Sequence, residues 1–369
     1  MTDLAHVPLH DLHVGLGARF APFAGYEMPL RYAEGAIAEH LWTRSSASLF
    51  DVSHMGVFEV SGAGAVDALE TVVPSALREL AVGAGRYTFF PTGDGGGVLD
   101  DLIVTRLAPD RFQLVVNAGN KHVDRRHVLE HLGDRPDVEV GGFDDVGILA
   151  LQGPLAADVL TSVAGPAPAG LAFGNQADHP VAGVTCRISR SGYTGEDGFE
   201  LIVPVDGLAD VAAALLADER VRPAGLGARD SLRLEAGFCL HGNDLSADIN
   251  PIAAGLGWTV QRRRREEGGF AGADRLLAEI ADGPARRRVG LAVGGRRPVR
   301  PGATLTDPSG DVVGEVTSGT FGPSVDAPIA MGYVDTDLAT PGTELLAVER
   351  GRPEPVTVAT LPFVAHRRS

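Results

Sequence analysis

The sequence predicts an α+β protein in which a small all-β domain follows a larger mixed part. The chain has 369 residues, more than a single hydrophobic core usually holds, which predicts two or three domains. Residues 56–97 have the pattern of a strand, a helix and further strands. From Arg288 onward, short strand-like runs alternate with Gly and Pro turns, as in small all-β domains. The character of the sequence changes past about Phe270, ahead of these strand-like runs.

The first part of the chain contains a predicted hairpin. Residues 56–62 (GVFEVSG) alternate as a half-buried strand does, and Ala65–Val72 has the pattern of a short helix. Arg86–Phe90 and Val98–Arg106 are apolar runs joined by the Gly-rich turn Gly93–Gly97, which predicts a β-hairpin. No GK[ST] sequence follows these glycines, so they do not form a phosphate-binding loop.

The remaining elements are predicted from shorter patterns. Arg111–Val116 is expected to be a strand, and Ile148–Leu151 a short buried strand. Pro154 favours the start of a helix over Leu155–Val163. Two more helices are expected over Leu208–Asp218 and Leu226–Ala236, and six C-terminal strands over residues 289–293, 303–307, 312–316, 330–334, 343–348 and 355–361.

The composition argues against several classes of partner. The formal net charge of −16 argues against nucleic acid, since phosphate binding needs a basic face. No apolar run approaches the length of a membrane-spanning helix, and residues 1–10 lack the features of a signal peptide, so no membrane association is expected. The cysteines, Cys186 and Cys239, lie outside any CxxC pair and fit a reducing compartment. A cytoplasmic location is therefore expected.

One basic segment is present in this acidic chain. Arg262–Arg265 form a run of arginines, and further arginines follow at residues 286–288, 296–297 and 300. Such a run is either a docking patch for an acidic partner or a solvated linker, and by itself the linker is the commoner case.

The segment GYTGEDGFE, from Gly192 to Glu200, is the strongest indication of a ligand site. Glycine lets a backbone come close to a flat ligand. A carboxylate at the mouth of such a loop accepts two parallel hydrogen bonds from an amidine-like edge, such as that of a guanidinium or a pterin. An isolated segment of this kind is usually a Gly-rich turn with solvated acids, so the other motifs decide between the two interpretations.

Asp100 and Asp101 lie in VLDDLIVTR, a strand that is otherwise apolar. A buried acid costs free energy unless it is paired or used. If the strand alternates, Asp101 shares a side with Leu99 and Ile103, and one of the two acids is expected to face a cleft. The alternative is that both acids cap the hairpin in water.

Two further motifs offer candidate polar residues. Arg229 in GLGARDSLRLEAG offers a planar fork to a carboxylate or a ring carbonyl, or else forms an ordinary surface ion pair. Ser53 and His54 in FDVSHMG lack the GxSxG context of a nucleophilic serine. The sequence contains neither HExxH nor clustered histidine ligands, so no metal is expected.

Taken together, the motifs resemble the aminomethyltransferase, or T-protein, family of the glycine cleavage system. The resemblance extends from about Pro8 to Phe363. The C-terminal sequence PFVAHRRS (362–369) departs from the usual tail of the family. The motifs occur in the family's order: FAGYEMPL (23–30), EHLWTR (39–44), FDVSHMG (50–56), LDDLIVTR (99–106), VVNAGNK (115–121), ALQGP (150–154), SGYTGEDGFELIVP (191–204), GLGARDSLRLEAG (225–237), GLGWTV (255–260), GEVTSGTF (314–321) and IAMGYV (329–334).

This resemblance implies a fold and an activity. Members form a three-domain clover leaf, with two α+β domains containing ferredoxin-like elements and a C-terminal β-barrel or jelly-roll domain. By position, the domains comprise residues 1–52 with 138–227, residues 53–137 with 228–280, and residues 281–369. Tetrahydrofolate binds in the central cleft. These enzymes take an aminomethyl group from the lipoyl arm of the H-protein, release ammonia and form 5,10-methylenetetrahydrofolate, and the arm leaves as the dithiol.

The resemblance also implies roles for individual residues. Asp101 is the catalytic carboxylate beside the reacting folate nitrogens, and Asp100 is the second choice for this role. Glu200 holds the pterin edge with two hydrogen bonds. The other residues expected around tetrahydrofolate are Tyr87, Tyr193, Asn117, Arg229, Trp258 and Met55.

Other activities use the same scaffold. Folate-dependent demethylases, and the folate domains of dimethylglycine and sarcosine oxidases, act on methyl groups without a lipoyl carrier. Some relatives are folate-binding assembly factors for iron–sulfur proteins and carry a cysteine signature, whereas Cys239 lies in GFCLHGND, which matches the transferases. The LDDLIVTR and GEVTSGTF segments favour the aminomethyltransferase. Because the family's lipoyl carrier is usually acidic, Arg262–Arg265 gain a more specific interpretation as a docking patch for it.

Overall fold

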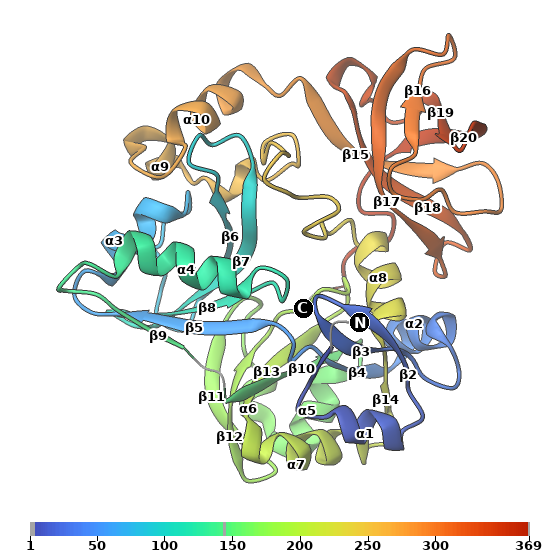
Figure 1. Ribbon diagram of the computed structural model, residues 1–369. Coiled ribbons are helices and arrows are strands. Elements are labelled where there is room, and N and C mark those ends of the chain that lie inside the picture. Colours follow the sequence, from blue (N-terminus) through green and yellow to red (C-terminus); the bar gives the residue numbers. More distant parts are fainter. Residues whose placement is uncertain (1–3, 143–144, 368–369) are drawn as a thin grey trace.

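The computed structural model describes residues 4–142 and 145–367, and residues 1–3, 143–144 and 368–369 lie outside this description. The last two belong to the divergent tail. The described chain forms three lobes around a common centre (Figure 1), built on a six-stranded sheet, a five-stranded sheet and a closed barrel. The α+β class with a C-terminal barrel, predicted from the sequence, is confirmed.

The six-stranded sheet is buried on both faces at its central strand β10. Leu149 and Leu151 pack toward α5 (Ala156–Ala164) and α7 (Val205–Leu216), whereas Ile148 and Ala150 belong to the apolar cluster that includes α8 (Leu226–Glu235). This explains why the predicted strand is a continuous apolar run. In sheet order, the strands are β11 (Gln176–Val181), β12 (Val184–Ser189), β13 (Gly198–Pro204), β10 (Val146–Gln152), β4 (Ala47–Asp51) and β14 (Val221–Pro223), and α6 is Pro166–Ala169.

A small N-terminal sheet, which was not predicted, precedes β4. Its strand order is β1-β3-β2, and β1 pairs with β3 in parallel. Two helices accompany it and lead the chain into the six-stranded sheet. The elements are β1 (Ala5–His6), α1 (His10–Gly15), β2 (Arg19–Phe23), β3 (Tyr26–Arg31) and α2 (Ala36–Ser45).

The five-stranded sheet contains the predicted hairpin. β6 pairs antiparallel with β7, and α3 (Ala65–Val72) and α4 (Lys121–Leu132) contribute to its apolar core. In sheet order, the strands are β6 (Gly85–Pro91), β7 (Val98–Ala108), β8 (Arg111–Val116), β5 (Gly56–Ser61) and β9 (Glu139–Gly142). The predicted strands and the helix Ala65–Val72 are confirmed here.

The hairpin turn needs its glycines because another part of the chain lies against it. A Cβ on Gly97 would meet the carbonyl oxygen of Ala247 at 1.8 Å. Gly95 has a φ of +72°, and a Cβ there would meet the Gly272 carbonyl oxygen at 2.3 Å. The segment that packs here contains η1 (Gly257–Thr259), α9 (Arg262–Glu267) and α10 (Ala273–Asp282), which lie above β6 and β7 in Figure 1.

The C-terminal barrel contains all six predicted strands. Its core is formed by small and medium apolar residues that point inward from each strand. The strands, in barrel order, are β15 (Arg286–Val293), β18 (Ala327–Asp335), β17 (Val312–Gly322), β16 (Thr304–Thr306), β19 (Glu344–Glu349) and β20 (Arg352–Ala359), and the short helix η2 is Thr336–Leu338.

A buried ion pair attaches the barrel to α8. Arg233 Nη1 donates to Asp244 Oδ2 at 2.7 Å, and both side chains are at most 2% exposed. Arg233 Nη2 donates to Ser318 Oγ on β17 at 2.9 Å, and Tyr333 on β18 donates its hydroxyl to the Asp244 carbonyl oxygen at 2.7 Å. The GEVTSGTF and IAMGYV motifs therefore supply side chains that anchor the barrel.

We expect Arg233→Met to lower the free energy of unfolding by about 3 kcal/mol or more, because it leaves the buried Asp244 carboxylate without its partner. Urea unfolding followed by circular dichroism measures this change. The control is Arg262→Met, because Arg262 forms an exposed ion pair with Glu266 and its loss should cost less than about 1 kcal/mol. Equal losses in the two variants would contradict the assigned role of Arg233.

Candidate active site

Asp100 and Asp101 lie next to each other on β7 but have different surroundings. Asp100 is fully buried, whereas Asp101 is partly exposed. In the register with β6, Asp100 lies opposite Phe90 and Asp101 opposite Phe89. Because side chains alternate along a strand, the two acids point to opposite faces of the sheet.

Two asparagines hold the Asp100 carboxylate. The Asn117 backbone N–H donates to Asp100 Oδ2 at 3.0 Å, and Asn117 Nδ2 donates to Oδ1 at 3.0 Å. Asn120 Nδ2 lies 2.7 Å from Asp100 Oδ1 and 2.9 Å from His241 Nδ1. His241 Nε2 lies 3.3 Å from the Val98 carbonyl oxygen, and His241 Nδ1 lies 3.9 Å from Asp100 Oδ1. Sequence reasoning missed Asn120 and His241.

Asp101 is held from the neighbouring strands on either side. Tyr87 on β6 donates its hydroxyl to Asp101 Oδ2 at 2.9 Å, and Asn117 Nδ2 donates to Oδ1 at 3.0 Å. Burial raises the pKa of Asp101 to about 6; the charge of Asp100 adds to the rise, and the Tyr87 hydrogen bond and His241 oppose it. Such a group is mostly ionised at pH 7 and is basic enough to take a proton.

Asp124 on α4 is a further acid near this pair that sequence reasoning missed. Its side chain is fully buried, and a hydrogen bond with Asp100 favours its protonated form. Burial raises the pKa of Asp124 to about 10, and the neighbouring Asp100 and Asp101 add to the rise. Asp124 is therefore neutral at pH 7, which avoids a third negative charge in the cluster.

Trp258 on η1 forms an exposed aromatic surface beside Asp101. Its ring stacks on Tyr87, with centroids 5.8 Å apart and planes 19° apart. Trp258 is 60% exposed. A large apolar ring left in water next to a titratable group suits a surface that a flat ligand covers.

The GYTGEDGFE loop and α8 form a second cluster. Tyr193 donates its hydroxyl to the Cys239 carbonyl oxygen, and the Arg229 guanidinium lies over the Tyr193 ring, 4.7 Å from its centroid. Arg229 Nη1 is buried and has no hydrogen-bond partner among the described residues. Burial lowers the pKa of Arg229, and the charge of Glu200 opposes this shift. Ser191 donates its hydroxyl to Glu200 Oε2 at 2.7 Å, which orients the carboxylate.

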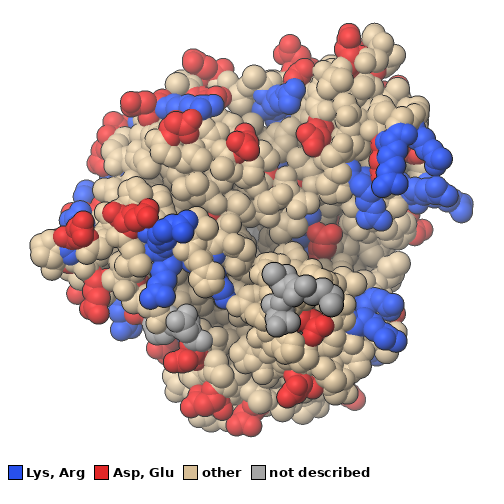
Figure 2. Space-filling model, viewed as in Figure 1, with Lys and Arg blue, Asp and Glu red and all other residues tan. Residues whose placement is uncertain are grey.

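The two clusters lie close enough to interact. Burial raises the pKa of Tyr193, and the charge of Asp101 contributes to the rise. Figure 2 shows a hollow at the centre of the viewed face, where the three lobes meet. Met55 is half-buried and packs against the apolar cluster that includes Phe50 and Ala228.

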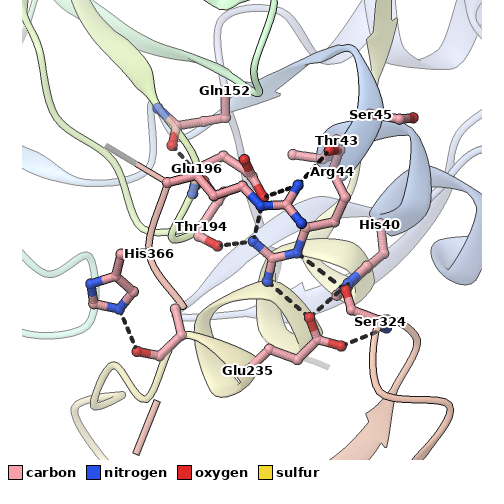
Figure 3. A network of polar contacts seen from close by, with 12 residues as sticks. His40, Thr43, Arg44, Ser45, Gln152, Thr194, Glu196, Glu235, Ser324 and His366 are labelled. Carbon is pink, nitrogen blue, oxygen red and sulfur yellow. Dashed lines mark hydrogen bonds and ion pairs between the residues drawn. The ribbon is translucent and has the colours of Figure 1, made fainter. Parts of the chain in front are cut away.

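Arg44 on α2 supports the GYTGEDGFE loop (Figure 3). Its Nη1 donates to the Thr194 carbonyl oxygen at 2.8 Å and to Glu196 Oε1 at 3.0 Å, and its Nη2 donates to Glu235 Oε2 at 2.9 Å. Ser324, between β17 and β18 of the barrel, donates its backbone N–H to Glu235 Oε1 at 2.7 Å. Burial favours the neutral acid, yet the contact with His40 Nε2 at 3.1 Å and the hydrogen bonds from Ser324 and Arg44 lower the pKa of Glu235 to about 2.

The C-terminal tail lies against the same loop. The Arg367 backbone N–H donates to the Gly195 carbonyl oxygen at 2.8 Å, and His366 Nε2 donates to the Ala236 carbonyl oxygen at 2.8 Å. The Val364 backbone N–H donates to the Glu235 carbonyl oxygen at 3.0 Å. The divergent tail is thus part of the support of the loop.

The arginine run is a helix and not a linker. Arg264 is buried and donates to the Glu70 carbonyl oxygen, and Arg263 forms an ion pair with the Glu70 carboxylate at 2.5 Å. Arg262 and Arg265 are exposed. Of the four arginines interpreted as a docking patch, only these two are therefore fully exposed.

Both parts of the chain match a family model. Residues 9–264 match the GCVT N-terminal domain, and residues 286–365 match the glycine cleavage T-protein C-terminal barrel domain. The chain belongs to the glycine cleavage T-protein family. The resemblance seen in the sequence motifs is confirmed.

Relatives of this family match over nearly the whole chain. The mitochondrial aminomethyltransferase of Flaveria anomala is 44% identical, over 98% of this chain and 90% of that protein. The probable mitochondrial aminomethyltransferase of Schizosaccharomyces pombe is 42% identical, over 98% of this chain and 94% of that protein. The crystal structure of the glycine cleavage system aminomethyltransferase T from Bartonella henselae matches with a TM-score of 0.94 and 45% identity, over 99% of both chains.

These relatives contradict the cytoplasmic location expected from the sequence, because several of them are named mitochondrial. Cysteine usage reports whether a compartment is reducing and does not distinguish one reducing compartment from another. Separately, none of the helices in the described part of the chain is long and apolar enough to cross a membrane.

We expect Tyr87→Phe to raise the pKa of Asp101 further, because the lost hydroxyl stabilises the ionised carboxylate. The acid would then ionise above about pH 6. Carboxyl carbon NMR titration of the Asp101 resonance measures this shift. Tyr193→Phe is the matched control, because the Tyr193 hydroxyl donates to a backbone carbonyl and not to Asp101. A pKa of Asp101 that falls in Tyr87→Phe would contradict the assignment.

Proposed function

We propose that this chain is the tetrahydrofolate-dependent aminomethyltransferase of glycine cleavage. It moves the aminomethyl carbon from the lipoyl arm of the H-protein to tetrahydrofolate and yields 5,10-methylenetetrahydrofolate, ammonia and the dihydrolipoyl arm. The family models and the aminomethyltransferase names of full-length relatives support this activity. The observation that carries the site is the position of Asp101, a carboxylate with a raised pKa beside the exposed Trp258–Tyr87 stack.

The second cluster suits the polar edge of a folate ring. Arg229 Nη1 is a buried donor that no described residue satisfies, and a ring carbonyl is a suitable acceptor for it. Glu200, oriented by Ser191, accepts the parallel N–H donors of a pterin. Aromatic faces and an apolar contact complete the set of residues that we assign to folate: Tyr87, Tyr193, Trp258 and Met55, together with Asn117.

Asp101 handles a proton in the proposed reaction. Two C–N bonds form between the aminomethyl carbon and the folate nitrogens, while the C–N bond to the departing ammonia and the C–S bond to the lipoyl arm break. The two protons lost by the folate nitrogens balance those gained by ammonia and the thiol. Asp101, mostly ionised at pH 7, accepts a proton from the folate amine, and Tyr87 and Asn117 keep its carboxylate oriented.

The division into three domains also stays a prediction. Separate apolar cores in the two large sheets and the barrel support it. β9 lies within residues 138–227, the range expected for the first domain, yet it pairs with β5 of the five-stranded sheet. This pairing favours a boundary after residue 142.

Product formation from tetrahydrofolate and aminomethyl-loaded H-protein tests the proposed function. We expect 5,10-methylenetetrahydrofolate and ammonia to appear together and only when the loaded carrier is present. Folate binding without carrier-dependent turnover would reject the proposal and direct attention to methyl donors.

We expect Asp101→Asn to lower turnover by about 10²–10⁴-fold while tetrahydrofolate still binds, since the change removes the proton acceptor and keeps the shape. Steady-state rates and a folate titration measure the two effects. Asp94→Asn is the matched control, because Asp94 is exposed in the turn of the same hairpin. Full activity of Asp101→Asn would move the catalytic role to Asp100 or remove it.

We expect the double variant Arg262→Glu/Arg265→Glu to raise the KM for H-protein about tenfold at low salt, because the acidic carrier loses electrostatic attraction. Tetrahydrofolate affinity should not change, and added salt should reduce the difference. Arg296→Glu/Arg297→Glu is the control, since these arginines are exposed on the barrel. An unchanged KM in the first variant would rule out docking at α9.

A further inference from the structure

Three side chains near the N-terminus form a group that the proposed transfer reaction does not use. Within the described residues, His6, His10 and Glu27 each bring one potential metal ligand atom to within 4.8 Å of the others. His6 Nε2 lies 3.4 Å and His10 Nε2 lies 2.9 Å from the same atom, Glu27 Oε2. Both imidazoles therefore converge on one carboxylate oxygen.

The fold fixes the positions of these side chains. β1 pairs with β3 so that His6 lies directly beside Glu27. His10 is the first residue of α1, and its ring stacks on that of His6 with centroids 3.8 Å apart and planes 3° apart. Phe20 on β2 packs against His10 at 4.9 Å. Strand pairing places His6 beside Glu27, and the two parallel imidazole rings rotate out of their stack when both Nε2 atoms bind one ion.

A second carboxylate faces the other nitrogen of His10. Asp11 Oδ1 lies 3.7 Å from His10 Nδ1. Histidines that bind a metal through one ring nitrogen commonly direct the other toward a carboxylate, which favours the proton there and leaves the first nitrogen free to bind. The exposed Asp11 carboxylate therefore lies near the His10 nitrogen that does not face Glu27.

We propose that His6, His10 and Glu27 bind a Zn²⁺ ion. Two imidazole nitrogens and one carboxylate oxygen suit zinc and leave the fourth tetrahedral position for water, whereas Mg²⁺ and Ca²⁺ prefer sites made of oxygen alone. The side chains of His6 and Glu27 are 55% and 37% exposed, so the ion reaches the site from solvent. The ion joins β1, α1 and β3 and takes no ligand from the residues assigned to folate.

The sequence analysis expected no metal, because the spacing of potential ligands along the chain matches no metal-binding motif. The proposed zinc site differs from that expectation. His6 and His10 are four residues apart, and His10 begins a helix of six residues, which is a weak pattern on its own. Glu27 lies 17 residues beyond His10 and joins the pair only through the pairing of β1 with β3. The pattern is therefore visible in the fold and not in the sequence.

Titration of the metal-free, full-length protein with zinc by calorimetry tests the proposal. We expect saturable binding at this site, and we expect His6→Gln, His10→Gln and Glu27→Gln each to weaken it by about tenfold or more. His122→Gln, which alters an exposed histidine on α4, is the matched control and should leave the affinity unchanged. Co²⁺ should give the visible absorption of a four-coordinate site in the wild type and lose it in the three ligand variants.

Two outcomes would overturn the proposal. One is zinc affinity that stays the same in all three ligand variants, and the other is an equal loss in His122→Gln. His6→Gln changes the most exposed ligand, so its thermal unfolding without metal should match that of the wild type. Its aminomethyl transfer without zinc should also match, which separates this site from the proposed reaction.

Discussion

The arrangement around the candidate active site depends on the buried ion pair between Arg44 and Glu235. The Glu235 side chain is fully buried and that of Arg44 is 8% exposed, so either charge alone would carry a penalty of several kcal/mol (about 3–5). Arg44 comes from α2, Glu235 from α8, and Ser324 closes the network from the barrel. The free-energy cost of burying these charges is offset only when the three elements meet. The Arg44 guanidinium also donates hydrogen bonds to the GYTGEDGFE loop.

α8 carries three charged side chains that contact other elements. Arg229 faces the ring of Tyr193, Arg233 is paired with Asp244 under the barrel, and Glu235 is paired with Arg44. One short helix thus directs charged side chains toward the ligand cluster, the barrel and the N-terminal segment.

Local patterns along the chain predicted the fold well, and the structure brings together candidate site residues that belong to recognisable motifs. The hairpin and the barrel strands follow from alternation and glycine turns, which depend on neighbours in sequence. Local patterns could not predict the roles of Asn120, His241 and Asp124. Their partners lie on other elements, and the type of a polar residue does not indicate which residue it contacts. The burial of Arg264 could not be predicted for the same reason, since its partner Glu70 lies far away in sequence.

The exposed position of Trp258 bears on the intrinsic fluorescence of the protein. The chain has two tryptophans, Trp42 and Trp258. The indole N–H of Trp42 donates to the carbonyl oxygens of Ala47 and Arg220, and its ring lies under the Arg222 guanidinium. Trp258 instead faces solvent on the Tyr87 ring. If tetrahydrofolate covers Trp258 as proposed, intrinsic fluorescence has a constant component from Trp42 and a variable one from Trp258, so emission wavelength and quenching follow folate binding without an added label.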